Sequence, residues 1–175
     1  MANFYGADFD SHRILLICRH AKSSWEDSSL NDFERPLNKR GLRDAPVMGQ
    51  RLRARGFLPD LIVSSPAVRA QRTAEMYAEA LEYPLESIQY NQQQYAATWL
   101  ELLSLIQQVD DRFRRIFLVG HNPESTSLAN ALGGLAIANI PTAGMVALSF
   151  HCSTWTNVRE QSGKLLFFDF PKNPF

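Results

Sequence analysis

The sequence lacks most features that would place the protein outside the ordinary globular class. It has two cysteines in 175 residues and no net formal charge, with 18 basic and 18 acidic side chains. A neutral chain gives no support for bulk binding to nucleic acid, and no apolar run reaches the roughly 18 residues that a membrane span requires. No spacing of His and Cys predicts a zinc site. Glycine and proline, 9 residues each, are too few for a fibrous or disordered chain.

The cysteines and the N-terminus bear on the compartment. Cys18 and Cys152 lie next to apolar residues. A disulfide between them is one interpretation, but we favour two reduced, buried thiols in a cytoplasmic protein. Residues 1–12 contain two aspartates and no apolar stretch, so we expect an N-terminal extension and not a signal peptide. The length predicts a single domain over residues 1–175.

Short apolar blocks alternate with segments whose apolar residues recur at helical spacing. The expected strands are Ile14–Cys18, Leu58–Val63, Ser87–Tyr90, Arg115–Val119, Met145–Phe150 and Leu165–Phe170. The expected helices are Lys39–Gly56, Pro66–Leu81, Trp99–Val109 and Glu124–Leu132. This alternation predicts an α/β fold with a mainly parallel sheet, whose last two strands form a hairpin at one edge.

Charged and polar side chains follow three of the expected parallel strands. Arg19 and His20 follow the first strand, Arg69 comes soon after the second, and His121 follows the fourth. Ligands of open α/β sheets bind beyond the carboxyl ends of the strands. We therefore expect two histidines and two arginines to meet at this end of the sheet.

Two arginines near one point favour an anion, most simply phosphate, because guanidinium presents a planar fork to phosphate oxygens. Helices that begin after Pro66 and Pro123 would add backbone donors and the positive ends of helix dipoles. A neutral imidazole can attack phosphorus, and neighbouring positive charge lowers its pKa and keeps it neutral. Phosphoryl transfer depends mainly on positioning and charge stabilisation, so we expect no metal and no cofactor.

Three segments, in this order, resemble the motifs of the histidine phosphatase superfamily. They are Arg19–Trp25, Ser64–Ala74 and Gly120–Pro123. The segment Arg35–Gly41 resembles the loop that enters the first helix in the SixA-type phosphohistidine phosphatase branch of that superfamily. The likeness extends from about residue 14 to residue 169.

The resemblance implies a fold and a role for each of the four residues. The family fold is a three-layer α/β/α sandwich around a mostly parallel sheet with an antiparallel strand near one edge, as in phosphoglycerate mutase. His20 would be the nucleophile and would form a phosphohistidine intermediate. Arg19 and Arg69 would bind the phosphoryl oxygens, and His121 would donate a hydrogen bond to one of them.

Residues beside His20 add candidates and departures. Ser23 is a candidate donor to phosphate, and Lys22 adds positive potential or a direct contact. Ala21 stands where the family has glycine, a mild change where the backbone needs no glycine-only conformation. Glu26 stands where mutase-type members have an asparagine that touches phosphate; its charge would repel phosphate, which argues against a phosphoglycerate mutase.

The general acid is unassigned. Many family members carry an acidic proton donor near the third strand, but residues 92–95 are Gln-Gln-Gln-Tyr here. Asp32, Glu34 and Glu101 are the candidates, or no dedicated acid exists. An alkoxide leaving group needs a proton donor, whereas phosphohistidine has a weak P–N bond and can arrive already protonated on its ring. A short chain with little room for a lid would also admit a phosphohistidine carried by a protein.

We therefore predict a metal-independent phosphatase that forms a phosphohistidine intermediate on His20 and dephosphorylates phosphohistidine on a protein. Its partner would be a phosphorylated protein or a small phosphorylated substrate, without nucleic acid or membrane, and the protein would be a monomer. Two alternatives stay open: a broad-specificity acid phosphatase on small phosphoesters, and a non-catalytic phospho-ligand binding module.

Overall fold

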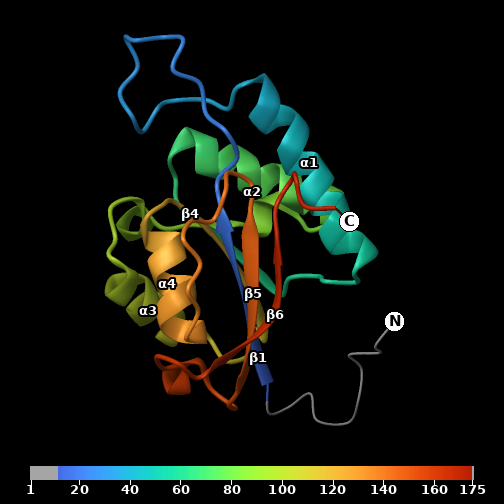
Figure 1. The fold of residues 1–175 in the computed structure, drawn as a ribbon, viewed down its shortest axis with the longest axis vertical. Coiled ribbons are helices and arrows are strands. Elements are labelled where there is room, and N and C mark those ends of the chain that lie inside the picture. Colours follow the sequence, from blue (N-terminus) through green and yellow to red (C-terminus); the bar gives the residue numbers. More distant parts are fainter. Residues whose placement is uncertain (1–11, 175) are drawn as a thin grey trace.

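The sheet is built from the apolar blocks that alternate with helices along the chain. In the computed structural model, which describes residues 12–174, the strand order is β3-β2-β4-β1-β5-β6. The strands are β1 (His12–Arg19), β2 (Leu61–Ser64), β3 (Gln89–Tyr90), β4 (Arg115–Gly120), β5 (Met145–His151) and β6 (Gly163–Asp169). Strands β1 to β4 are parallel, whereas β5 is antiparallel to both β1 and β6 (Figure 1). The predicted parallel sheet with an antiparallel pair at one edge is confirmed.

Helices cover both faces of this sheet and complete three layers. They are α1 (Lys39–Ala54), α2 (Val68–Leu81), α3 (Trp99–Gln107) and α4 (Glu124–Gly133). One buried apolar cluster joins α1 and α2 to the sheet through Met48, Tyr77 and Phe117. The other joins α3 and α4 to it through Leu128 and Ile116. Because successive strand residues point to opposite faces, the neighbours Ile116 and Phe117 belong to different clusters, and β4 is covered on both sides.

Element boundaries differ from the sequence-based expectation by one to three residues, and the starts of the second strand and the second helix have a common cause. The second strand begins at Leu61, where pairing with Ile116 of β4 starts, and not at Leu58, which is exposed. The second helix begins at Val68 and not at Pro66. In each case a proline lies in the turn before the element, outside the regular hydrogen-bond pattern.

The carboxyl ends of β1, β2 and β4 lie level with one another. Arg19 of β1 pairs with Gly120 of β4, and Ser64 of β2 pairs with the adjacent Val119. The loops that follow these strands therefore begin at the same end of the sheet. The segment between β1 and α1 projects beyond that end, at the top of Figure 1.

The structure also bears on the thiols, the N-terminus and the membrane. Cys18 and Cys152 are both free; Cys18 is fully buried, but Cys152 is only partly buried, so the expectation of two buried thiols was wrong for Cys152. Burial raises the pKa of the Cys18 thiol, which makes it a poor nucleophile. The expected N-terminal extension lies, except for its last residue, outside the described residues. None of the helices within residues 12–174 is long and apolar enough to span a bilayer.

Candidate active site

His20 is the first residue after β1, and its contacts determine the tautomer of its ring. The residue is buried, with 9% of its surface exposed. Its Nδ1 lies 2.7 Å from the carbonyl oxygen of Ala21, so Nδ1 carries the proton and donates it there. The Nε of Arg69 donates to His20 Nε2 over 3.3 Å. His20 Nε2 therefore keeps an unprotonated lone pair that faces Arg69.

The surroundings keep His20 neutral. Burial lowers the pKa of His20 to about 3, and the positive charges of Arg69 and Arg19 act in the same direction. The hydrogen bond to the Ala21 carbonyl opposes this shift but is outweighed. At neutral pH the lone pair on Nε2 is available for attack on phosphorus.

Arg69 lies in the first turn of α2 and joins the two histidines to a carboxylate. Its side chain is buried, and its Nη2 lies 3.4 Å from Nδ1 of His121. The same Nη2 donates to Oδ2 of Asp32 over 2.8 Å, while Nη1 donates to the Asp32 backbone carbonyl. Arg69 is thus the group that connects the loop after β1 with both rings.

His121 follows β4 and faces His20. The two ring centroids are 5.2 Å apart, with an angle of 55° between the planes. His121 Nε2 lies 2.7 Å from Oγ of Ser65, and the ring of Tyr95 packs edge-on against it with centroids 5.6 Å apart. Burial and the charge of Arg69 lower the pKa of His121 to about 4. Both rings are therefore neutral at pH 7.

Arg19, the last residue of β1, is held by the segment that precedes β5. Its Nη1 donates to the carbonyl oxygen of Ile140 over 2.8 Å and to Oδ1 of Asn139 over 3.3 Å. Its Nε is buried and has no hydrogen-bond partner among residues 12–174. Because its charge lowers the pKa of both His20 and His121, it acts on the same small volume as Arg69.

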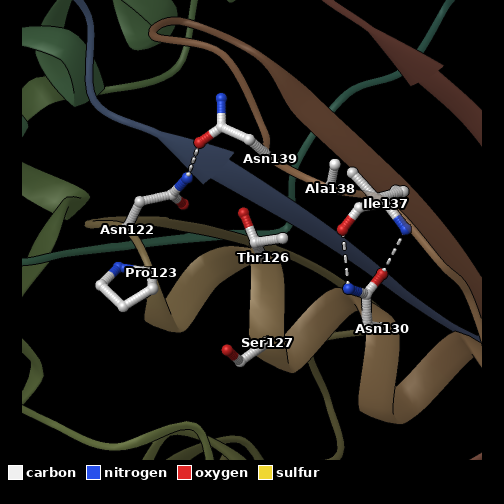
Figure 2. A pocket seen from close by; sticks show the side chains of 8 residues that line it. All are labelled: Asn122, Pro123, Thr126, Ser127, Asn130, Ile137, Ala138 and Asn139. Carbon is white, nitrogen blue, oxygen red and sulfur yellow. Dashed lines mark hydrogen bonds between the residues drawn. The ribbon is translucent and has the colours of Figure 1, made fainter.

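A further pocket, of about 440 Å³, lies beside Arg19, between the start of α4 and the loop that follows that helix. It is a neighbour of the site around His20 and is lined by other residues. Its lining residues are Asn122, Pro123, Thr126, Ser127, Asn130, Ile137, Ala138 and Asn139 (Figure 2). Figure 2 shows that the amide groups lining it bond to their neighbours: Asn122 donates to Asn139 over 2.8 Å, and Asn130 pairs with the backbone of Ile137. These groups hold the loop that binds Arg19.

Ser23 and Lys22, the further candidates for phosphate contact, lie in the loop after β1 and contact other parts of the protein. Ser23 is buried, and its Oγ accepts a hydrogen bond from Nη2 of Arg35 over 2.7 Å. The backbone of Lys22 packs on Gly41, where an added Cβ would come within 2.3 Å of the Lys22 carbonyl oxygen. Ala21 is buried and is not among the described residues with positive φ, so the backbone there accepts alanine.

Of the three candidate acids, the structure connects Asp32 to the pocket. Burial raises the pKa of Asp32, but hydrogen bonds from Tyr95, Arg35 and Arg69 outweigh this effect and lower it to about 2. Asp32 is therefore ionised at neutral pH and has no proton to donate. Its carboxylate oxygens accept hydrogen bonds of 2.8 Å from these three side chains.

The other acids and the glutamine segment have different surroundings. The Glu101 carboxylate accepts from the backbone N–H and hydroxyl of Thr98 and closes a capping box at the start of α3. Glu34 is exposed. Gln94 is buried, and its Nε2 donates to the carbonyl oxygen of Val119 at the end of β4 over 2.8 Å. A glutamine side chain therefore supports the end of β4 in the segment where the family resemblance implied an acidic residue.

Sequence reasoning assigned no role to Tyr95, Arg35 or Asn139. Arg35 was visible in the loop motif, and Tyr95 in the glutamine-rich segment, but neither pattern shows contact with Asp32. Asn139 lies in a segment with no periodic pattern. Among residues 12–174, no group of three or more His, Cys, Asp or Glu side chains is arranged to hold a metal ion. Two guanidinium groups near two neutral imidazoles supply the charge and the N–H donors that an anion would need.

Comparison with known proteins adds independent information. A sequence model of the histidine phosphatase superfamily, branch 1, matches residues 15–93. An uncharacterized protein of Mycobacterium tuberculosis is 30% identical over 164 residues, which covers 88% of this chain and 99% of that protein. A structure from Agrobacterium tumefaciens assigned as phosphohistidine phosphatase SixA superimposes with a TM-score of 0.76 at 27% identity, covering 91% and 98% of the two chains. The protein histidine phosphatase SixA complexed with tungstate shares the fold, with a TM-score of 0.76 at 18% identity over 90% and 97%.

Proposed function

Because this chain belongs to the histidine phosphatase superfamily, in its SixA-type branch, we propose that it is a phosphatase that carries the phosphoryl group on His20 and acts on phosphohistidine in a protein. The observation that supports this best is the unprotonated Nε2 of a neutral, buried His20, directed at Arg69 and next to His121. The chemistry requires no metal, because the arginines supply the positive charge.

The proposed reaction has two displacements at phosphorus. In the first, the Nε2 lone pair of His20 attacks, a P–Nε2 bond forms, and the bond between phosphorus and the leaving group breaks. In the second, water attacks phosphorus and the P–Nε2 bond breaks. Inorganic phosphate leaves with the water oxygen, the second water proton passes to phosphate or solvent, and neutral His20 is restored.

Positive groups around His20 would stabilise the charge on the transferred phosphoryl group. Arg69 offers the N–H groups at Nε and Nη2, and Arg19 offers a buried Nε that has no partner within the described part of the chain. A hydrogen bond to a charged group contributes about 1.5–3 kcal/mol, and such bonds are shorter and stronger than neutral ones. A phosphoryl oxygen would also accept from His121 once that ring holds its proton on Nδ1.

The state of the nearby carboxyl group supports the proposed substrate class. Asp32 contacts the pocket through Arg69, and it is ionised. A phosphoester with a basic leaving group would therefore lack its proton donor at this carboxyl. A phosphohistidine ring that arrives protonated leaves as neutral imidazole and needs no further proton, which favours a P–N substrate.

The first test removes the nucleophile. His20→Ala should lower kcat/KM for a phosphohistidine peptide and for p-nitrophenyl phosphate at least about 1,000-fold, and rapid quenching should no longer trap a phosphorylated protein. His151→Ala is the matched control, because His151 is an exposed histidine that pairs with His12. Turnover by His20→Ala at the wild-type rate would remove the nucleophile assignment.

The second test separates the substrate classes in the wild-type protein. We expect a higher kcat/KM for the phosphohistidine peptide than for p-nitrophenyl phosphate. Equal or better turnover of small phosphoesters would identify a broad-specificity phosphatase. Calorimetric binding of phosphate without hydrolysis of either substrate would identify a binding module.

A further inference from the structure

Arg69 presents two different sides of its guanidinium group to the site. Nε and Nη2 lie along one edge and face the rings of His20 and His121. Nη1 and Nη2 form the end of the group, and both donate to Asp32, through its backbone carbonyl and its Oδ2. We propose that Asp32 is a positioning residue, which holds the end of Arg69 so that the Nε–Nη2 edge stays directed at a phosphoryl group on His20. This inference rests on the phosphatase function proposed above.

The contacts of Asp32 explain how a side chain with half of its surface exposed can hold a buried arginine. Its Oδ1 accepts from Nη1 of Arg35, and its Oδ2 accepts from the hydroxyl of Tyr95 as well as from Arg69, each over 2.8 Å. Arg35 is itself buried and bonded to Ser23. An exposed ion pair contributes little because its partners are mobile and solvated, but three donors, one of them the buried Arg35, keep this carboxylate in one place.

Arg35 is held on its other side as well. Its Nε donates to the carbonyl oxygen of Ser24 over 2.9 Å, and its guanidinium carbon lies 3.1 Å from the ring centroid of Trp25. The loop after β1 therefore supports Asp32 through Arg35, and Asp32 supports Arg69. The support reaches the histidines through Arg69, and this makes Asp32 a positioning residue in the proposal.

Two other roles for this carboxylate, general acid and competitor of phosphate, would each require a geometry different from the one observed. A general acid would keep a proton and face the leaving group, but both Asp32 oxygens accept hydrogen bonds from protein donors. An internal competitor of phosphate would take the N–H groups that face the histidines. Asp32 takes the end of the guanidinium group instead, and leaves the Nε–Nη2 edge to His20 and His121.

The test uses Asp32→Ala and Asp32→Asn, with Asp27→Ala as the matched control. Asp27 is an exposed carboxylate of the same loop, hydrogen-bonded to Ser29. We expect kcat/KM of Asp32→Ala for p-nitrophenyl phosphate to fall about 10- to 100-fold, because Arg69 loses a charged partner. Asp32→Asn should recover part of this loss, since an amide oxygen still accepts from Nη2, and Asp27→Ala should stay within about twofold of wild type.

Two further measurements separate the three roles. If Asp32 is a positioning residue, Asp32→Ala should lower kcat/KM equally for p-nitrophenyl phosphate and for phenyl phosphate, and it should weaken inhibition by orthovanadate. A general acid would show a loss confined to phenyl phosphate, whose leaving group needs the proton. A competitor would show stronger vanadate inhibition after its removal.

Wild-type kinetics of Asp32→Ala on both substrates, or either of those other patterns, would overturn the proposal. None of these results would affect the role of His20, because His20→Ala tests that role separately. A thermal melt of each variant checks that the fold is retained, and the partial recovery by Asp32→Asn keeps the test decisive where Asp32→Ala loses stability.

Discussion

The two arginines of the pocket are held by different chemistry. Arg19 donates to neutral oxygens, the carbonyl of Ile140 and the amide of Asn139, whereas Arg69 donates to the carboxylate and carbonyl of Asp32. A carboxylate offsets much of a guanidinium charge and fixes its plane, while neutral acceptors leave the charge in place. The difference indicates that a charged partner fixes the orientation of Arg69 more firmly than neutral acceptors fix that of Arg19, while both charges act on the two histidines.

The largest effects should come from replacing the arginines themselves. We expect kcat/KM for p-nitrophenyl phosphate to fall about 1,000-fold in Arg69→Ala and about 100-fold in Arg19→Ala, which correspond to two and to one or two lost charge-assisted hydrogen bonds. Lysine keeps the charge but not the planar fork. Arg19→Lys should therefore recover more activity than Arg69→Lys, and the opposite order in steady-state kinetics would contradict the comparison.

The side of the pocket formed by Arg69 also holds two neutral histidines, and this should make stability depend on pH. The folded-state pKa values of His20 and His121 are lowered to about 3 and about 4. Between these values and the ordinary pKa of about 6.5 the unfolded chain binds more protons than the folded protein, so stability is lost as pH falls below about 6.5. From pH 7 to pH 5 the free energy of unfolding should drop by roughly 2–4 kcal/mol.

Urea denaturation at the two pH values measures this drop. The control is the His20→Ala, His121→Ala double variant, in which most of the pH dependence between pH 7 and pH 5 should disappear. A double variant that loses as much stability as wild type over this range would show that other groups cause it.

The fold and four of the pocket residues could be predicted because they depend on short-range patterns. Continuous apolar blocks predict buried parallel strands, and Arg19, His20, Arg69 and His121 lie at or shortly after the ends of three of them. The partners of the arginines could not be predicted. The position of Asn139 behind Arg19 depends on the return of the chain into β5, since the backbone N–H of Arg19 donates to Gly144 just before that strand.

The pKa of Asp32 is a second property that the sequence could not predict. Its carboxylate could be recognised near the pocket from its place in the loop after β1, as a candidate acid. Its low pKa depends on hydrogen bonds from Tyr95, which lies 63 residues away in the sequence, from Arg35 and from Arg69. Long-range contacts of this kind set the pKa of a side chain and leave no local pattern in the sequence.

Asn139→Ala tests the neutral hydrogen-bond partners of Arg19, and we expect a smaller effect. It removes the amide oxygen that accepts from Arg19 and from Asn122 but leaves the Ile140 carbonyl in place. We expect kcat/KM to fall about three- to tenfold, since one of two neutral acceptors is lost. Ser127→Ala, at another residue that lines the 440 Å³ pocket beside Arg19, is the control. A loss as large as that of Asp32→Ala would show that the two arginines depend equally on their partners.

Tyr95→Phe should give the smallest effect, because it removes one of the three donors to Asp32 and keeps the ring against His121. We expect kcat/KM to fall about two- to threefold, the loss of a single hydrogen bond to an exposed carboxylate. Tyr83→Phe, which removes a hydroxyl bonded to the Ser87 carbonyl, is the matched control. Since Tyr95 acts through Asp32, its substitution should change nothing further in the Asp32→Ala background. An undiminished effect in that double variant would show that the Tyr95 hydroxyl acts on the pocket directly, and the support of Arg69 would then end at Asp32 and Arg35.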